Sequence, residues 1–210
     1  ILSMRGQYWK WRMHGGAVTM ARRYLKEGKS PHCILATDML DLSSFLAFTR
    51  SATAGVPAAL YFHENQLSYP WSPADRDIIK KRDRHYGFIN YASALAADMV
   101  FFNTDSHRSR FLDDLDRFLR HFPDHNERDS VKLIEKKSRV LHLGLDLAGL
   151  DGQDNTEKSS PAILWNHRWE YDKNPEDFFD VLFALAREDR DFSVIILGEN
   201  FSRKPGIFQQ

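Results

Sequence analysis

Two cationic side chains stand close together in the stretch NHRWEYDKNP, residues 166–175. Arg168 offers a planar guanidinium and Lys173 a compact ammonium, and the Asn-Pro that follows is typical of a helix start. Backbone N–H groups at such a start add to the positive potential, so this arrangement suits the binding of a phosphate or diphosphate. The alternative is that the two cations form surface ion pairs with Glu170 and Asp172. The residues alone leave both possibilities open.

A second polar stretch, HENQ, directly follows an apolar run at residues 58–62. Four consecutive large hydrogen-bonding side chains without glycine or proline make a poor turn. They are well suited to binding sugar hydroxyls or a nucleobase, which we favour over an ordinary turn. The residues of this stretch are His63, Glu64, Asn65 and Gln66.

Polar side chains also follow the other apolar runs of the chain. In an open parallel sheet, the loops after the carboxyl ends of the strands diverge and form the ligand-binding crevice. Further candidates for ligand contacts at such ends are Asn103, Ser106, His142 and Asp146 in the first part of the chain, and Asn166, His167, Gly198 and Glu199 in the second. Residues 103–106 could equally be no more than turn formers and a helix cap.

Several common sites are absent from the sequence. There is no GxGxxG and no GxxxxGK[ST], and HENQL is not the zinc motif HExxH. His121 and His125 are four residues apart, but Pro123 interrupts the helix that would align them as metal ligands. Cys33 is the only cysteine, which excludes a cysteine cluster. We predict no bound metal and no cofactor.

The elements that must position these residues can be read from the hydrophobic pattern. Short apolar runs bounded by polar residues predict four strands, at His32–Ala36, Ala58–Phe62, Asp98–Phe102 and Arg139–Leu143. Helical patterns lie between them, most clearly at Asp75–Ala97 and Ser106–Arg120. This alternation predicts an α/β domain over residues 1–148, with a doubly wound, Rossmann-like parallel sheet covered on both faces by helices.

A second unit follows the polar segment 149–160, which contains two glycines and is the best linker candidate. Within residues 161–210 we predict a strand at AILW, a helix over Pro175–Glu188 capped by Asn174, and a strand over Phe192–Leu197. These elements are the beginning of a second Rossmann-like domain. The chain starts with Ile1 and stops soon after its last strand, so we expect a fragment of a longer protein.

Composition places the chain among ordinary globular proteins. Hydrophobic residues make up 42% and charged residues 28%, and the 29 basic side chains balance the 29 acidic ones, which argues against coating nucleic acid by bulk charge. The sequence has neither an apolar run of about 18 residues nor a signal-peptide pattern, so we expect a cytoplasmic protein without a membrane partner. The basic run KKRDRHYGF, residues 80–88, is typical of a solvated helix face, with contact to RNA phosphates as the alternative.

The predicted architecture, with arginine and lysine in the first strand-to-helix loop of a second domain, resembles the retaining GT-B glycosyltransferases. More closely, the stretches FHENQLSYP, RDRHYGFINYASALAADMVFFNTDSHRSRFL, FPDH and WNHRWEYDKNPEDFF, followed by VIILGENF, resemble the glycosyltransferase-like-domain-containing proteins. The activity assigned to that family is tRNA-queuosine α-mannosyltransferase. The resemblance extends over most of residues 9–208.

This resemblance implies retaining transfer of mannose from GDP-mannose to queuosine in the anticodon loop of tRNA(Asp), without a metal. It implies that Arg168 and Lys173 bind the donor diphosphate and that His63 reaches the transferred sugar, and we predict His63 and Glu64 as the catalytic residues. We expect acceptor or sugar contacts from Asn65, Gln66, Asn103, Ser106, His142 and Asp146. We expect the donor-side loops to contribute Asn166, His167, Gly198 and Glu199.

Two alternatives stay open beside this function. One is a glycosyltransferase with a different acceptor, and the other is a non-catalytic module that binds a nucleotide sugar or tRNA. The family's glycine-rich loop would lie upstream of Ile1, and its acidic contacts to the donor sugar beyond Gln210. We therefore expect this chain alone to be inactive.

Overall fold

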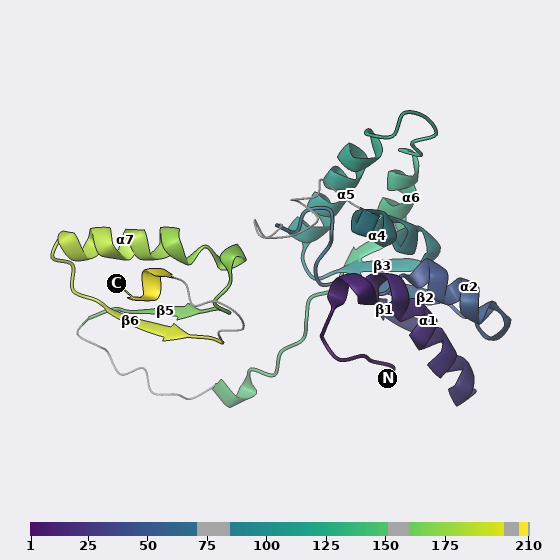
Figure 1. The fold of residues 1–210 in the computed structure, drawn as a ribbon, viewed down its shortest axis with the longest axis horizontal. Helices are drawn as coiled ribbons and strands as arrows, with labels where there is room; N and C mark the ends of the chain where they lie inside the picture. The colour runs from purple at the N-terminus through teal and green to yellow at the C-terminus, as the bar shows by residue number, and fades with distance from the viewer. Residues whose placement is uncertain (71–84, 151–159, 200–205, 210) are drawn as a thin grey trace. The chain divides into compact units, whose positions relative to one another are not determined.

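The computed structural model describes residues 1–70, 85–150, 160–199 and 206–209 of the chain. The chain forms two compact units: the first comprises Ile1–Tyr69 and Asp77–Leu145, and the second comprises Asp146–Gln210 together with Pro70–Arg76. Each unit has its own parallel sheet (Figure 1). Most of the predicted linker lies outside the described residues.

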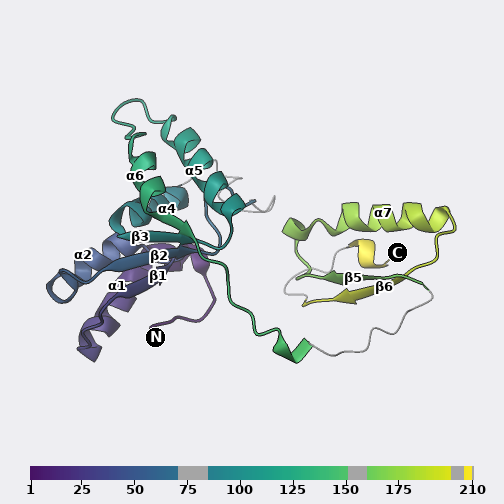
Figure 2. The ribbon, with the colours of Figure 1, turned by 180° about the vertical axis from the view of Figure 1, so that it is seen from behind.

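The first unit is built on a four-stranded parallel sheet in the order β1-β2-β3-β4. Its strands are β1 (Ile34–Thr37), β2 (Ala58–Phe62), β3 (Met99–Phe102) and β4 (Ser138–Val140). The strands lie side by side in both ribbon views (Figures 1 and 2), and their carboxyl ends meet at one edge because every pair is parallel. The predicted α/β fold class with a Rossmann-like sheet is confirmed.

The limits of the outer strands differ from the predicted ones because each strand ends where its partner ends. Strand β1 begins at Ile34, opposite Ala58, rather than at His32. Strand β4 stops at Val140, opposite Phe102, rather than at Leu143. The leucines that follow it have left the sheet and are exposed, at positions Leu141, Leu143, Leu145 and Leu147.

Five helices belong to the described part of the first unit: α1 (Trp9–Glu27), α2 (Leu42–Thr53), α4 (His85–Ala96), α5 (Asp105–Leu119) and α6 (Ser130–Lys137). Helix α5 confirms the predicted helix over 106–120, and Thr104 caps it by accepting a hydrogen bond from the backbone N–H of His107. Helix α4 confirms the end of the predicted helix over 75–97. The first ten residues of that prediction lie outside the described part of the chain.

One hydrophobic cluster holds this unit together, and all five helices contribute to it. On β2 the side chains of Ala58, Leu60 and Phe62 are buried in this cluster, whereas Ala59 and Tyr61 on the opposite face are only half-buried. Sequential strands joined by right-handed crossovers place their helices on the same side of a sheet, in keeping with the burial of this one face of β2. Cover by helices on the second face stays a prediction.

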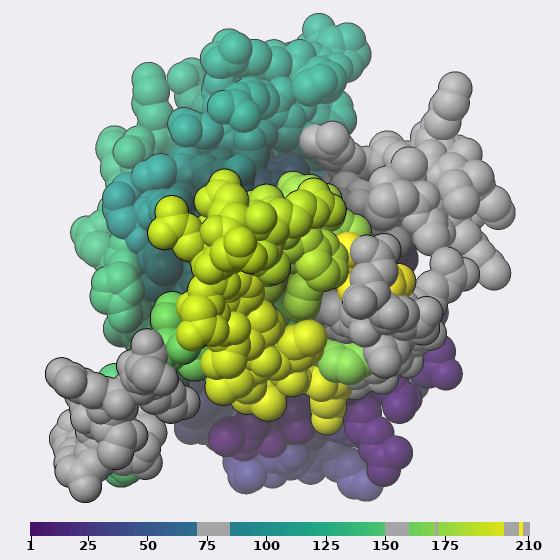
Figure 3. Space-filling view, turned by 90° about the vertical axis from the view of Figure 1, so that its left-hand side faces the viewer, coloured from purple at the N-terminus to yellow at the C-terminus, as the bar shows by residue number. Residues whose placement is uncertain are grey.

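The second unit contains a strand, a helix and a second strand: β5 (Ala162–Asn166), α7 (Pro175–Arg187) and β6 (Ser193–Leu197), which pairs parallel to β5. The short helical turns η1 (Ala148–Leu150), η2 (Tyr171–Lys173) and η3 (Gly206–Gln209) complete it. A small core forms around Trp165, Phe179 and Leu182. Apolar side chains of this unit are exposed at Val181, Ile195 and Leu197. Figure 3 draws the unit in green to yellow.

No helix in the described ranges combines the length and the hydrophobicity that crossing a bilayer requires.

Candidate functional site

The centre of the site in the first unit is a histidine held by a buried carboxylate. Asp38 follows β1 and His63 follows β2, and the register that pairs Thr37 with Tyr61 brings them together. His63 Nδ1 contacts Asp38 Oδ1, and the backbone N–H of His63 donates to the same oxygen at 3.4 Å. The Asp38 side chain is 0% exposed, whereas that of His63 is 46% exposed. Asp38 thus fixes the ring from inside while one side of the ring faces solvent.

This pairing changes the acid–base behaviour of His63. The hydrogen bond to the Asp38 carboxylate raises the pKa of His63, and the negative charges of Asp38 and Glu64 act in the same direction. Partial burial of the ring lowers the pKa of His63, but by less than these interactions raise it. His63 therefore keeps its proton to a higher pH than an ordinary histidine, and can offer a charged hydrogen-bond donor to a ligand.

Asn103 connects three of the loops at this edge of the sheet. Its Nδ2 donates to the carbonyl of His63 at 3.1 Å, and its Oδ1 lies 2.9 Å from Nδ1 of His107. Its own carbonyl accepts a 2.9 Å hydrogen bond from Nδ1 of His142. The structure therefore brings together three of the predicted site residues, His63, Asn103 and His142, and adds His107.

His107 is a second histidine with the opposite pKa shift. Burial between aromatic rings lowers the pKa of His107, and His63 lowers it further, although Asp38 works against both. Its ring stands edge-on to Phe102, with 5.3 Å between centroids. Its Nε2 is buried and has no hydrogen-bond partner in the structure. The site thus contains one histidine that favours the charged form and one that favours the neutral form.

The side chains of Asn65 and Gln66 are both buried in the loop after β2. Asn65 Oδ1 accepts hydrogen bonds from the backbone N–H groups of Leu67 and Ser68, each at 3.1 Å, so its side chain holds the turn. The backbone N–H of Gln66 donates to Asn90, and the Gln66 amide lies 3.5 Å from Glu64. Contact of either side chain with a sugar stays a prediction.

Asn90, on α4, fastens the loops after β1 and β2 to each other. Its Oδ1 accepts from the backbone N–H of Gln66 at 2.8 Å, and its Nδ2 donates to the carbonyl of Asp38 at 2.9 Å. Asn90 is fully buried, so both hydrogen bonds are shielded from water. Through Asn90 the packing of α4 fixes the position of the buried carboxylate that holds His63.

The remaining candidates of the first part of the chain lie apart from this network. Ser106 is exposed on the first turn of α5, where Thr104 rather than Ser106 provides the cap. Asp146 belongs to the second unit, and its carboxylate accepts a hydrogen bond from the backbone N–H of Ala148 at 3.2 Å. Ligand contacts of Ser106 and Asp146 stay predictions.

In the second unit the loops after β5 and β6 touch each other. The backbone N–H of Trp169 donates to the carbonyl of Glu199 at 3.1 Å. Gly198 has φ +134°, and a Cβ placed there would lie 1.8 Å from the carbonyl oxygen of His167. Asn166 forms the end of β5 beside Leu197. The four predicted donor-side residues therefore lie together, and glycine is required at 198 for the close approach.

Both predicted phosphate ligands form ion pairs with neighbouring acids. Arg168 lies 3.5 Å from Glu170, and Lys173 lies 2.7 Å from Asp172, which are the pairs that the sequence offered as the alternative. The guanidinium is exposed, so a bound anion can reach it without unfolding the loop. Binding of a diphosphate by the two cations stays a prediction, and it would have to compete with these acids.

Asn174 does not cap α7 as predicted. Its φ of 47° places it in the left-handed region, whereas a capping residue has an extended backbone. Its Nδ2 instead donates to Asp177 at 2.7 Å. Pro175 does occupy the first turn of α7, as predicted.

Three residues of the site were not predicted: Asp38, Asn90 and His107. Asp38 carried a signal, because it directly follows an apolar strand. Asn90 and His107 lie inside helical sequence, where no spacing distinguishes them from surface residues. In the described ranges, no three His, Cys, Asp or Glu side chains gather as metal ligands would. The predicted absence of a metal stays a prediction.

Comparison with known proteins adds to this geometry. A family model described as tRNA-queuosine alpha-mannosyltransferase N-terminal matches residues 1–145, and this match ends where the first unit ends. A curated Drosophila melanogaster protein, tRNA-queuosine alpha-mannosyltransferase, is 33% identical over 219 aligned positions. The alignment covers 100% of this chain and 56% of that relative, so the chain spans about half of the relative's length.

Proposed function

The chain belongs to the tRNA-queuosine alpha-mannosyltransferase family, and from this premise we propose that the complete protein transfers mannose to queuosine in tRNA. The donor is GDP-mannose, the acceptor is tRNA(Asp), and the mannose keeps its anomeric configuration. The two units of the chain belong to a GT-B glycosyltransferase. The observation that carries the proposal is His63, which Asp38 holds with a raised pKa at the carboxyl edge of the sheet.

His63 serves the reaction as a charged hydrogen-bond donor to a hydroxyl of the transferred sugar. A hydrogen-bond donor that is fixed before the substrate arrives does not have to reorganise when charge develops in the transition state. Such preorganised hydrogen bonds stabilise the transition state most strongly. Asp38 provides this fixation, and Asn103 holds the carbonyl of the same histidine. Glu64, next in the chain, adds negative charge beside the electron-poor sugar of the transition state.

Arg168 and Lys173 stabilise the diphosphate that leaves with the nucleotide. Two cations in one loop can balance the charge that develops on the leaving group, so no metal is needed for that task. In the structure, Arg168 forms an ion pair with Glu170, and Lys173 forms one with Asp172. We expect the donor diphosphate to displace both acids, because its charge is larger than that of a carboxylate.

The substrates can be tested with the complete protein and two tRNA(Asp) preparations, one with queuosine and one without it. With radiolabelled GDP-mannose, we expect label only in the tRNA that contains queuosine. Equal labelling of both preparations would show a different acceptor. Binding of GDP-mannose and tRNA without any transfer would show a non-catalytic module.

The diphosphate site can be tested with Arg168→Ala in the complete protein. This variant should lower kcat/KM for mannosyl transfer at least ~100-fold, because the leaving diphosphate loses one of its two cations. An unchanged value would refute the assignment of the diphosphate site.

A further inference from the structure

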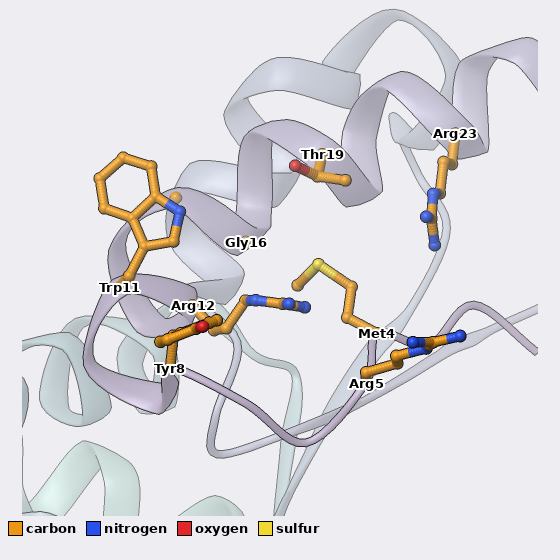
Figure 4. A pocket seen from close by; sticks show the side chains of 9 residues that line it. Met4, Arg5, Tyr8, Trp11, Arg12, Gly16, Thr19 and Arg23 are labelled. Atoms are coloured by element: carbon orange, nitrogen blue, oxygen red, sulfur yellow. The ribbon is translucent and has the colours of Figure 1, made fainter.

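A groove with a volume of about 560 Å³ lies between the N-terminal segment and α1, within the first unit. Figure 4 shows Arg12 and Arg23 reaching from the helix toward the segment, while Met4 rises from the segment to meet them. Arg5 lies on the segment itself. The groove is therefore formed by one helix face and a stretch of extended chain.

The helix side of the groove is a single stripe. Along the chain, Arg12, Gly16, Thr19 and Arg23 follow one another at intervals of four, three and four, which places them on the same face of α1. Trp11 and Gly15 lie beside this row on the helix, and Tyr8 directly precedes the helix. The stripe thus presents two aromatic rings near the start of the helix and two arginines along it.

Two adjacent glycines allow close packing against the helix at the groove. Glycine inside a helix costs about 0.5–1 kcal/mol relative to alanine, so a pair of them calls for a reason in the packing. A Cβ on Gly16 would lie 2.9 Å from the Met4 side chain, and a Cβ on Gly15 would lie 2.9 Å from the Trp11 ring. The glycines therefore let the segment and the indole approach the helix.

The charge of the groove has one sign. Three arginines line it, and no carboxylate does. In the described part of the chain, none of Arg5, Arg12 and Arg23 forms an ion pair within 4 Å, although Arg23 interacts electrostatically with Glu27 and donates one hydrogen bond to the carbonyl of Ser3 at 2.8 Å. Guanidinium groups without carboxylate partners are complementary to phosphates, which they can bind through two parallel hydrogen bonds.

The aromatic rings indicate which kind of phosphate ligand fits. Trp11 is 69% exposed and Tyr8 is 77% exposed, although large aromatic side chains are usually covered. Exposed rings beside cationic groups form a surface on which unpaired bases stack while the backbone phosphates meet the cations. A free phosphate would not use the rings, and the bases of a double helix are already stacked. The combination favours single-stranded nucleic acid.

The helix that carries the groove also packs against the elements of the candidate site. Trp9, at the start of α1, lies 5.2 Å from Tyr86 between ring centroids, and His14 lies 4.9 Å from His85. These partners belong to the first turn of α4, whose Asn90 fastens the loops of Asp38 and Gln66. A nucleic acid in the groove would therefore be held by the same framework that positions His63.

We propose that this groove binds an unpaired segment of the acceptor tRNA, with Arg5, Arg12 and Arg23 on its phosphates and Trp11 and Tyr8 on its bases. This inference rests on the proposed function for the identity of the RNA. Its physical basis, a cationic groove with exposed rings, is separate from the histidine site. Neither the groove nor any of its residues is used in the chemistry derived above.

The test measures binding of tRNA(Asp) to the complete protein at several salt concentrations. Arg5→Ala and Arg12→Ala should each weaken binding and lower the slope of log K against log salt by about 0.7, because one phosphate contact is lost. Trp11→Ala should weaken binding roughly tenfold without changing that slope, because stacking releases no counterions. Arg22→Ala is the matched control, since Arg22 is exposed on the same helix but outside the groove.

Unchanged affinity and slope in all three groove variants would overturn the proposal, and so would an equal loss in Arg22→Ala. Binding of an acidic protein that depends on the arginines, with tRNA binding unaffected, would overturn it as well. Circular dichroism of each variant checks the fold, and we expect no unfolding because Arg5, Trp11 and Arg22 are exposed and Arg12 is half-buried. Mannosyl transfer is measured in parallel. Groove-dependent binding without transfer would refute the proposed function alone, whereas transfer with unaffected binding in the variants would refute the groove alone.

Discussion

The position of His63 depends on a single buried carboxylate. Asp38 Oδ1 binds both the ring and the backbone N–H of His63, while Asp38 Oδ2 is buried without a hydrogen-bond partner in the structure. A buried carboxylate is costly unless it is paired, so it strongly favours a protonated ring beside it. The pair therefore sets the charge of the site as well as its geometry.

Asp38→Asn should remove the rise in the pKa of His63. In the native protein the folded pKa lies above the unfolded value, so the pair stabilises the fold fully below about pH 6.5. This contribution is lost as the pH rises through the folded pKa. We therefore expect the stability difference between native protein and variant to be larger at pH 5.5 than at pH 8.5 in urea unfolding.

An NMR titration of His63 in the same variant gives the direct readout, a lower titration midpoint than in the native protein. Asp113→Asn serves as the control, because Asp113 is an exposed carboxylate of the same unit. An equal midpoint in the native protein and Asp38→Asn would show that another group controls the histidine.

At the scale of secondary-structure elements, contact between the loops after β5 and β6 shapes the predicted donor site. Gly198→Ala should separate these loops, since the added Cβ would lie 1.8 Å from the His167 carbonyl oxygen and the φ of +134° strains any other residue. We expect a loss of about 1–3 kcal/mol in the free energy of unfolding and weaker binding of GDP-mannose. Urea unfolding and calorimetric titration measure the two effects.

Gly206→Ala is the control for that substitution, because a Cβ at Gly206 meets no atom within 4 Å. If Gly198→Ala unfolds at the same urea concentration as Gly206→Ala and binds the donor normally, the contact between the loops has no role in the site.

Most of the elements could be predicted from the sequence, including both ends of β2, but the ends of the outer strands of the first sheet could not. Apolar runs and helical spacing identified the strands and α5, because burial of one face is a property of the local sequence. The end of β4 depends on where β3 stops, which is a property of the partner strand. The prediction that Asn174 caps α7 was wrong for a similar reason, because the preceding loop sets the backbone conformation at Asn174.

The site was predictable only where it coincides with strand ends. His63, Asn103 and His142 directly follow strands or lie beside them, and the topology of a parallel sheet alone brings them together. Asn90 and His107 reach the site from helices, through packing that no sequence motif encodes. Asn65 carried the right signal for a loop but serves the turn itself, which shows that a polar side chain at a strand end can be structural.

At the scale of the whole molecule, balanced net charge concealed a local concentration of cations. The 29 basic and 29 acidic side chains cancel, yet three arginines and no carboxylate line the groove on α1. The basic run 80–88 was considered above as a contact for RNA. Its residues 80–84 lie outside the part of the chain that the structure describes. Net charge therefore excludes coating of nucleic acid in bulk but not recognition by one groove.

In the proposed reaction, transfer of mannose depends on His63 more than on any other residue of the first unit. The most direct test is kcat/KM for mannosyl transfer to queuosine-containing tRNA by the complete protein with His63→Ala, compared with His32→Ala. His32 is an exposed histidine of the same unit and serves as the control. We predict a loss of ~100-fold or more in His63→Ala, with tRNA affinity unchanged, because one preorganised hydrogen-bond donor is removed. The variant should stay folded but be less stable, since Asp38 loses its partner. Equal kcat/KM values for the two variants would contradict the account.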